Sequence, residues 1–515
     1  MKLEKSEGKT KGKNYFQIQS ALDGSLLGTY RESSVNDLVR EIGHARAAAA
    51  RWRELRLKER LNYIKNIRSA FAERSGEIVD VVHRECGKVI PEIYGAEIIA
   101  NLELLNFYIR NSARMLKKER ISINPINYPR KKGYIIHRPH GLVGVISSWN
   151  FPVALAMRAI VPALVAGNGV VFKASPNASL IGDLLGDIFR SCLPAGLFIT
   201  AFGNKEVNQA VVDNVDKVNF IGSVATGVSV AERCAGRLIP CSTELSGKDA
   251  AIVLEDCNLE RTVNGVLWGA FTNSGQNCAS IERVFIVQEI YDQFLHDLVE
   301  KTKRLRPEVD YGPLRSETQV QLVLSHLDDA KKSGAKILCG GKRREKSLYI
   351  EPAVIAVRDP HAMFMQEETF GPTLPVYKVK DLNEAVALTN SARFGLTTSV
   401  WTEDKKNAET IAARLESGIV TFNNSVFTGA LAAAPWGGVK QTGHGVTNSK
   451  YGLLEMTRPH LLLIDNSRQA GEAWWYPYSQ NLTDLLRAIT DTFRGKLLAF
   501  LKVPGLLKKV LKEKL

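Results

Sequence analysis

The chain has 515 residues, of which 45% are apolar and 24% charged, and it carries a formal net charge of +14. These proportions are typical of globular proteins and exclude a disordered chain, a collagen-like repeat and a polytopic membrane protein. At roughly 100–200 residues per domain, the length indicates two to four domains.

The seven cysteines are scattered along the chain and form no CxxC pair. They are too few for a disulfide framework, and no Cys/His cluster has the spacing of a metal site, so we expect no metal and a reducing, cytoplasmic compartment. No apolar run reaches 18 residues, and residues 1–14 form a basic tail without the apolar core of a signal peptide. With no zinc-finger spacing or basic-aromatic motif, we expect no nucleic-acid partner.

Residues 35–120 are predicted to be helical, because apolar positions recur there at helical spacing. Short β-type runs follow over 121–138, and the basic turn at 130–133 suggests a hairpin.

From Gly141 the sequence alternates between apolar runs and helix-like segments. Strands are predicted at 142–147, 170–173, 197–202 and 218–221, with helices before 165 and near 179–191, 205–213 and 225–235. A second alternating stretch spans about 258–445 and includes strands at 281–287 and 399–401. This pattern predicts an α/β protein with parallel sheets, which bind ligands at the carboxyl ends of their strands.

The composition changes after Asp465. An aromatic cluster at 474–478 precedes a basic amphipathic stretch whose apolar residues fall on one helical face, and Pro504-Gly505 is expected to interrupt this run. Such a tail suits peripheral contact with a membrane surface; the alternative is that it packs on its own core or on a partner subunit.

Three short motifs carry candidate chemistry. They are Ser148-Trp149-Asn150-Phe151-Pro152 after the first parallel strand, Thr243-Glu244-Leu245-Ser246-Gly247-Lys248, and the polar segment 271–278, which ends at Cys278. Taken singly, each has an ordinary explanation: a helix cap, a solvated loop charge and a small buried thiol.

Together and in this order, the motifs resemble those of the aldehyde dehydrogenase superfamily. Further matches are Phe172-Lys173-Ala174-Ser175, Phe220-Ile221-Gly222-Ser223, Glu367-Glu368-Thr369-Phe370-Gly371-Pro372 and Pro435-Trp436-Gly437-Gly438-Val439-Lys440. The resemblance extends to about residue 465 and implies two Rossmann-like parallel-sheet domains with a small β oligomerisation element.

The resemblance also implies the catalytic residues. Cys278 would add to the aldehyde carbon, giving a thiohemiacetal and then a thioester. Asn150 and the Cys278 backbone N–H would hold the oxyanion, and Glu244 would activate water to release the carboxylate.

The cofactor implied is NAD or NADP. Gly222 and Ser223 would meet the pyrophosphate at a helix N-terminus, and Lys173 would reach the adenosine ribose. Glu368 would bond the nicotinamide ribose, Phe370 would pack beside that ring, and Trp149 is a further cofactor-binding candidate.

Two positions depart from the family pattern. Pro176 stands where NAD-preferring relatives have a glutamate that accepts bonds from the ribose hydroxyls, which weakens NAD preference and allows NADP. Ser246 stands where glycine is common, and this predicts slight crowding near the nicotinamide.

The expected substrate is an aliphatic aldehyde of medium or long chain. Arg158 matches a carboxylate-binding arginine of succinic semialdehyde dehydrogenases, but the second arginine position is Thr272. Succinic semialdehyde is therefore the alternative substrate. A CoA-acylating enzyme is disfavoured by Glu244, and an inactive membrane- or partner-binding scaffold is disfavoured by the complete set of catalytic residues.

The expected domains are a dinucleotide-binding domain (15–120 and 140–246), a catalytic domain (247–450), an oligomerisation element (121–139 and 451–468) and a C-terminal extension (469–515). We expect a homodimer or tetramer, because relatives extend a partner's sheet with the strand near 455–465.

Overall fold

We analysed a computed structural model of the chain, which describes residues 15–125, 128–468, 470–472 and 474–513. The basic tail predicted at 1–14 lies outside the described residues. The chain forms two compact units, Met1–Lys117 with His137–Arg458, and Lys118–Ile136 with Pro459–Leu515.

The first unit contains a six-stranded sheet of order β19-β9-β8-β5-β6-β7, parallel except for β19. Its strands are β5 (Leu142–Ile146), β6 (Gly169–Lys173), β7 (Phe198–Ala201), β8 (Lys217–Ile221), β9 (Cys241–Glu244) and β19 (Gly443–His444). The crossover helices are α6 (Ala154–Ala166), α7 (Ser179–Cys192), α8 (Lys205–Asn214) and α9 (Val224–Gly236), with the short turn η2 (Pro176–Ala178) before α7. Strands β5, β6 and β8 are buried at every position, as expected for a sheet covered on both faces.

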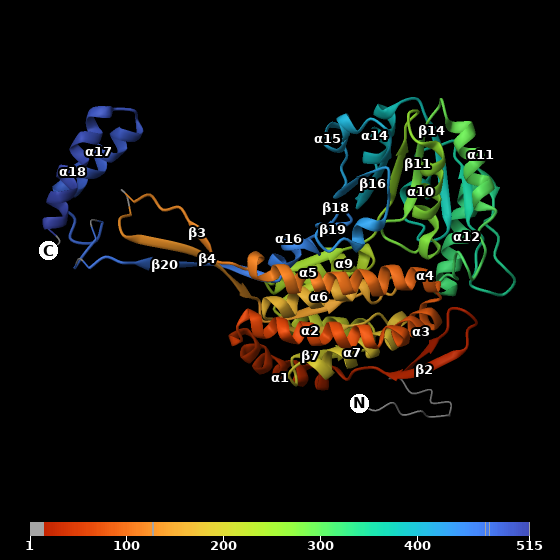
Figure 1. Cartoon of the computed structure of the whole chain (residues 1–515), viewed down its shortest axis with the longest axis horizontal. Helices are drawn as coiled ribbons and strands as arrows, with labels where there is room; N and C mark the ends of the chain where they lie inside the picture. The colour runs from red at the N-terminus through yellow and green to blue at the C-terminus, as the bar shows by residue number, and fades with distance from the viewer. Residues whose placement is uncertain (1–14, 126–127, 469, 473, 514–515) are drawn as a thin grey trace. The chain divides into compact units, whose positions relative to one another are not determined.

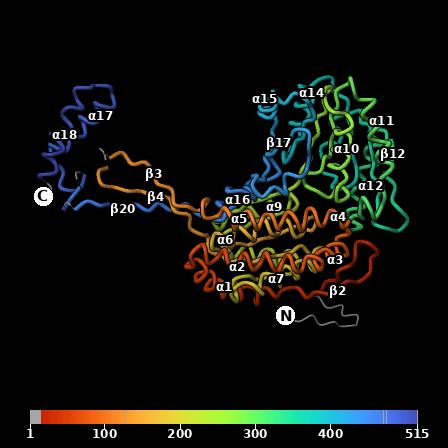
Figure 2. The backbone as a smooth tube through the Cα atoms, viewed as in Figure 1, coloured from red at the N-terminus to blue at the C-terminus, as the bar shows by residue number. Residues whose placement is uncertain are grey.

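Helices from the N-terminal part of the chain cover this sheet. They are α1 (Val35–Glu54), α2 (Leu57–Glu73), α3 (Ser75–Cys86), α4 (Ile90–Glu92), the π-helix η1 (Ile93–Ile99) and α5 (Ala100–Met115), preceded by the hairpin β1 (Tyr15–Gln19) and β2 (Leu26–Arg31). The predicted helical region is thus confirmed. Helices α2 and α7, far apart in sequence, lie side by side (Figure 2).

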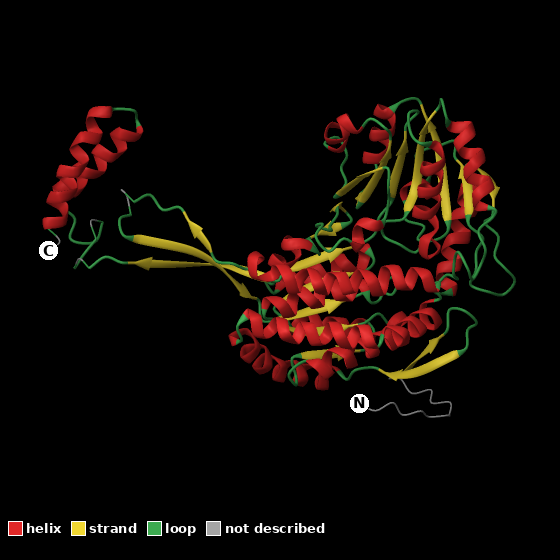
Figure 3. Ribbon diagram, viewed as in Figure 1, coloured by secondary structure: helices red, strands yellow, loops and turns green. Residues whose placement is uncertain are grey.

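A second sheet has the order β12-β13-β14-β11-β10-β16-β17. Its strands are β10 (Asp249–Val253), β11 (Ile281–Val287), β12 (Lys336–Cys339), β13 (Ala353–Ala356), β14 (Thr373–Val379), β16 (Thr397–Trp401) and β17 (Ile419–Phe422). All pair in parallel except β12. Helices pack around both sheets (Figure 1, Figure 3), and the α/β expectation is confirmed.

Helices and short elements complete the second half of the first unit. The helices are α10 (Leu259–Phe271), α11 (Tyr291–Thr302), α12 (Glu317–Lys332), α13 (Met363–Gln366), α14 (Leu382–Asn390), α15 (Ala408–Ala412) and α16 (Ser449–Glu455). The 3-10 turns are η3 (Thr272–Gly275), η4 (Lys405–Asn407) and η5 (Phe427–Ala430), and β15 (Phe394–Gly395) pairs with β18 (Val439–Lys440). No helix in the described ranges is both long and apolar enough to cross a membrane.

A three-stranded sheet of order β20-β4-β3 belongs to the second unit, with β4 and β20 continuing into the first. Its strands are β3 (Glu119–Ile121), β4 (Lys131–Pro139) and β20 (Thr457–Asp465). The predicted hairpin is confirmed, because β3 pairs antiparallel with β4. Its turn is not at 130–133 as predicted, since β4 already begins at Lys131 and Gly133 pairs with Ile121. Arg130, just before the strand, takes the positive φ (62°).

The C-terminal extension forms two helices, α17 (Gln480–Phe493) and α18 (Leu497–Lys512), which pack together as a hairpin. The predicted interruption at Pro504-Gly505 is wrong: α18 continues through it, and the chain reverses at Gly495, whose φ is 82°. Val503 and Val510 are buried in the hairpin core on either side of the proline, so packing holds the helix together across the hydrogen bond that proline cannot donate.

Candidate active site

The carboxyl ends of four parallel strands bring the expected residues to one edge of the six-stranded sheet. Trp149 and Asn150 follow β5, Lys173 ends β6, Gly222-Ser223 follows β8, and Glu244 ends β9. Because these strands are parallel, residues at their carboxyl ends share one edge.

Cys278 lies between η3 and β11 and contacts this edge. Its Sγ donates a hydrogen bond to Glu244 Oε1 at 3.5 Å, and a second contact joins Sγ to Asn277 Oδ1 at 3.8 Å. Glu244 is buried, and its other oxygen, Oε2, has no hydrogen-bond partner in the structure. A thiol and a carboxylate with one uncommitted oxygen therefore stand in contact, as a nucleophile and its base require.

Burial raises the pKa of the Cys278 thiol well above its usual range, and the nearby Glu244 raises it further. The Arg158 guanidinium acts in the opposite direction and lowers this pKa. The surroundings of Cys278 therefore favour the neutral thiol over the thiolate.

The loop that follows Glu244 passes directly against Cys278. A Cβ on Gly247 would lie 2.2 Å from the carbonyl oxygen of Cys278, so only glycine fits there. The Gly247 N–H donates to Glu368 Oε1 at 3.0 Å, and the Ser246 hydroxyl donates to the same carboxyl group. Ser246, expected only to crowd the nicotinamide, thus hydrogen-bonds a candidate cofactor ligand.

Asn150 is tied to the loop that carries the nucleophile. Its side-chain Nδ2 donates to the Gln276 carbonyl at 3.2 Å. The Asn273 amide donates to the carbonyl oxygens of Asn150 (3.0 Å) and Gln276 (2.9 Å). Asn273 has a positive φ of 51°, and these bonds hold it in that conformation.

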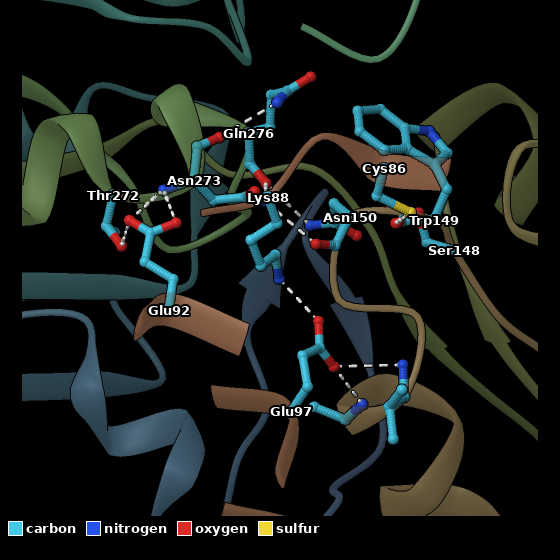
Figure 4. Close-up of polar contacts among 12 residues, drawn as sticks. Cys86, Lys88, Glu92, Glu97, Ser148, Trp149, Asn150, Thr272, Asn273 and Gln276 are labelled. Carbon is cyan, nitrogen blue, oxygen red and sulfur yellow. Dashed lines mark hydrogen bonds and ion pairs between the residues drawn. The ribbon is translucent and has the colours of Figure 1, made fainter. Parts of the chain in front are cut away.

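A buried ionic network lies behind Asn150 (Figure 4). Lys88 Nζ and Glu97 Oε1 are 2.6 Å apart, and both side chains are fully buried. Glu97 Oε2 accepts hydrogen bonds from the backbone N–H groups of Val153 and Ala154 at the start of α6. The ammonium group also lies 3.6 Å from the centre of the Phe151 ring, so this pair anchors the segment that follows Asn150.

A second carboxylate supports the other side of the site (Figure 4). Glu92 accepts bonds from the Asn273 N–H and, at 2.8 Å, from the Thr272 hydroxyl. Sequence reasoning missed Lys88, Glu92 and Glu97. One signal was available, because Glu97 interrupts the otherwise apolar stretch of η1.

A cavity of about 220 Å³ opens beside Cys278. The rings of Trp149 and Phe370 meet edge to face at its border, with centroids 5.7 Å apart. Its lining residues include the following: Ser148, Trp149, Asn150, Gly222, Ser223, Cys278, Gln319, Glu368 and Phe370. The cavity is lined by every sequence-predicted site residue except Glu244 and Lys173, together with Gln319, which sequence reasoning missed. Glu244 reaches the cavity through its contact with Cys278.

The residues around this cavity fit a dinucleotide. Helix α9 begins after Ser223, whose side chain makes no capping bond to the helix backbone, and Gly222 and Ser223 line the cavity; a helix N-terminus in this position is a candidate anion site. Burial, with a contribution from Glu282, raises the pKa of Glu368 to about 8. Burial lowers the pKa of Lys173, at the end of β6, to about 8.

The loop that carries Glu368 and Phe370 is held from β11. Glu282 accepts the N–H of Thr369 at 2.9 Å and that of Phe370 at 2.8 Å, and it pairs with the buried Lys248 at 2.6 Å. Phe370 has a positive φ of 51°. The Gln319 amide donates to the carbonyls of Thr369 and Phe370. The N–H groups and the carbonyl groups of these two residues are therefore all hydrogen-bonded.

The chain is similar to proteins of known family. The profile of the aldehyde dehydrogenase family matches residues 8–461. A 4,4'-diapolycopene aldehyde oxidase of Methylomonas sp is 34% identical over 483 residues, 93% of this chain and 91% of the relative.

Two further relatives carry NADP in their names. A provisionally named succinate-semialdehyde dehydrogenase (NADP(+)) 2 of Mycobacterium ulcerans (strain Agy99) is 35% identical, covering 85% of this chain and 86% of the relative. The solved structure of NADP-dependent glyceraldehyde-3-phosphate dehydrogenase from Bacillus halodurans C-125 complexed with NADP has a TM-score of 0.84 at 30% identity, over 88% of this chain and 96% of that one. This likeness confirms the fold expected from the motifs.

The raised pKa of Cys278 predicts slow alkylation at neutral pH. The rate with iodoacetamide should rise about tenfold per pH unit up to pH 9 without a plateau, because only the thiolate reacts. Mass spectrometry of the Cys278 peptide measures this rate, with Cys278→Ala identifying the background. A plateau below pH 8 would contradict the neutral thiol.

The buried Lys88–Glu97 pair predicts a large effect on stability. Glu97→Ala should lower the free energy of unfolding by about 3–5 kcal/mol, because it leaves Lys88 charged and buried without its partner. Lys303→Ala, which breaks an exposed pair with Glu300, is the control and should leave the free energy of unfolding nearly unchanged. Urea denaturation measures both, and equal small effects would refute the anchoring role.

Proposed function

The chain belongs to the aldehyde dehydrogenase family, and on that basis we propose that it oxidises an apolar aldehyde of medium or long chain to the carboxylate. The family and its relatives establish an NAD(P)-dependent oxidoreductase that acts on aldehydes. The single observation that carries the chemistry is the contact between Cys278 Sγ and Glu244 Oε1. The substrate class and the residue roles below are our proposal.

Cys278 is the proposed nucleophile. Its thiol proton passes to Glu244 as sulfur adds to the aldehyde carbon, which forms a thiohemiacetal on the chain. The developing oxyanion is stabilised by the Asn150 amide and the Cys278 backbone N–H. A donor of this kind is typically worth about 3–4 kcal/mol of barrier.

NAD or NADP, when bound, supplies the hydride acceptor. The acyl group then remains on Cys278 as a thioester. Glu244 first releases the thiol proton to solvent and is again a carboxylate; its uncommitted Oε2 is then placed to take a proton from an attacking water, and Cys278 leaves as the thiolate as the carboxylic product forms. This role favours hydrolysis over transfer to CoA, and the intact set of Cys278, Glu244 and Asn150 argues against an inactive scaffold.

The chain offers contacts to both halves of the cofactor. Ser223 and the start of α9 would hold the pyrophosphate, and Glu368 would bond the nicotinamide ribose. Lys173 would reach the adenosine ribose, and Pro176 would lie near it. Arg315 donates to the Asn177 carbonyl at 2.9 Å, so its positive charge also lies beside this turn. With no carboxylate at position 176 to repel it, a 2′-phosphate is tolerated here, and we propose that NADP is used at least as well as NAD.

The surroundings of Arg158 favour a substrate without a second carboxylate. Its Nη2 donates to the Gly429 carbonyl at 2.5 Å, and its guanidinium lies over the Trp436 ring at 5.3 Å. At the second arginine position, Thr272 donates to Glu92, a carboxylate that would repel a dicarboxylic substrate. The arginine is thus held by the chain, and Thr272 stands where a second arginine would be expected.

Two relatives support different substrates. The Methylomonas relative is named for the aldehyde of 4,4'-diapolycopene, an apolar molecule, and this favours our proposal. The Mycobacterium ulcerans relative is named for succinate semialdehyde, which keeps that substrate as the second candidate.

Exposed apolar surface in the second unit supports two assembly proposals. Strand β20 is an edge strand, and Leu461, Leu462, Leu463 and Ile464 on it are all exposed. We propose that it pairs with a second copy of the chain, giving a homodimer or tetramer. The basic C-terminal extension supports peripheral contact of a cytoplasmic enzyme with a membrane surface.

The substrate proposal predicts rates that rise with chain length. Initial reduction of NAD and NADP should increase from hexanal to dodecanal and hexadecanal, and succinic semialdehyde should be oxidised more slowly. Cys278→Ala should abolish the rate with every aldehyde, because it removes the nucleophile. A preference for succinic semialdehyde would overturn the apolar substrate and leave the reaction type intact.

The turn at Pro176 predicts a change in cofactor preference. Pro176→Glu should lower the NADP-to-NAD ratio of kcat/KM by about 10–100-fold, because a carboxylate accepts hydrogen bonds from ribose hydroxyls and repels the 2′-phosphate. Pro176→Gln is the matched control and should change the ratio much less. If both variants shift it equally, loss of the proline and not the charge is responsible.

A further inference from the structure

The hairpin of α17 and α18 buries one set of apolar residues and exposes another. Its core is formed by Leu482, Leu485, Ala488, Val503 and Val510. Each helix therefore buries one apolar face against the other. The exposed apolar residues have no packing partner of this kind among the described residues.

The exposed apolar residues gather where the chain reverses. Phe493, Leu497, Leu498 and Leu501 are 79%, 85%, 77% and 73% exposed, and they flank the turn at 494–496. We call these four residues and the turn the hairpin tip. Leu486, two helical turns earlier on α17, is less exposed at 52%. Four neighbouring large apolar side chains open to solvent are unusual on a protein surface.

Positive charge surrounds the hairpin tip. Arg494, Lys496 and Lys502 lie in or beside it, and the acidic residue there is Asp491, which pairs with Lys496 at 3.0 Å and with Arg494 at 3.8 Å. Over residues 480–513, seven Lys/Arg and three Asp/Glu leave a net charge of +4. An anionic surface is therefore the complementary partner.

We propose that the hairpin tip inserts into an anionic phospholipid surface. Phe493, Leu497, Leu498 and Leu501 enter the boundary between headgroups and acyl chains, and Arg494, Lys496 and Lys502 contact lipid phosphates. This inference deepens the membrane contact proposed above and rests on it. The proposed membrane contact is made by the hairpin tip and not along the whole length of α17 and α18.

Vesicle binding of the full-length protein tests this assignment. Co-sedimentation at low salt compares vesicles of phosphatidylcholine alone with vesicles that also contain phosphatidylglycerol as about one third of the lipid. We expect binding to the anionic vesicles. Leu498→Glu should lower the partition coefficient at least about tenfold, because it places a charge in the inserted region.

Leu486→Glu is the matched control, since it makes the same change on the same helical hairpin away from the tip. It should lower partitioning less than about threefold. Arg494→Gln with Lys496→Gln should lower binding to anionic vesicles roughly 25-fold, about fivefold per charge, and leave binding to neutral vesicles unchanged. Every variant should oxidise soluble hexanal at the wild-type rate.

Three results would overturn the proposal, each at a different level. Equal losses in Leu498→Glu and Leu486→Glu would mean that the hairpin lies flat and the tip is not inserted. Failure of the wild-type protein to bind anionic vesicles would remove the membrane contact itself. If Leu498→Glu changed the oligomeric mass measured by sedimentation but left vesicle binding unchanged, the hairpin tip would be a contact between copies of the chain. Hexanal oxidation reports on the catalytic proposal separately from all three.

Discussion

The parallel direction of the strands is the constraint on which the candidate site depends. Each of β5, β6, β8 and β9 must end at the same edge, so the residues that follow them are neighbours in space although they span about a hundred positions in sequence. Cys278 comes to that edge from the second sheet, just before β11. The candidate site thus forms where the strand ends of one sheet meet the beginning of a strand of the other.

Buried charges fix the backbone around this centre. Glu97 holds the start of α6 and Glu282 holds the loop at 369–370, each through two backbone N–H groups and one lysine. Burying such pairs is costly, and their Coulombic attraction offsets that cost only when the remaining polar atoms are bonded. Here the backbone N–H groups that bond Glu97 and Glu282 belong to segments beside Asn150 and Phe370. Burying these charges therefore helps to fix the positions of the candidate site residues.

The sequence was sufficient to predict the alternating architecture and the residues within contiguous motifs, because strand periodicity and motif spacing are local properties. It was not sufficient for Glu92, whose partners lie about 180 positions away, or for Gln319, which acts on a distant loop. The tail shows a different limit. Pro504 is a strong local breaker, yet the packing of Val503 and Val510 outweighs it, and Gly495 provides the reversal instead. Tertiary contacts decided each of these cases.

Cys278 and Glu282 are separated by only three residues on the approach to and start of β11. Cys278 contacts Glu244 through its thiol, and Glu282 accepts hydrogen bonds from the loop at 369–370 beside the cavity. An inserted or deleted residue between them would shift one relative to the other by about 3.3 Å and turn a side chain to the opposite face of the strand. The number of residues at 279–281 is therefore strictly constrained, because a change in it would move Cys278 away from the loop at 369–370.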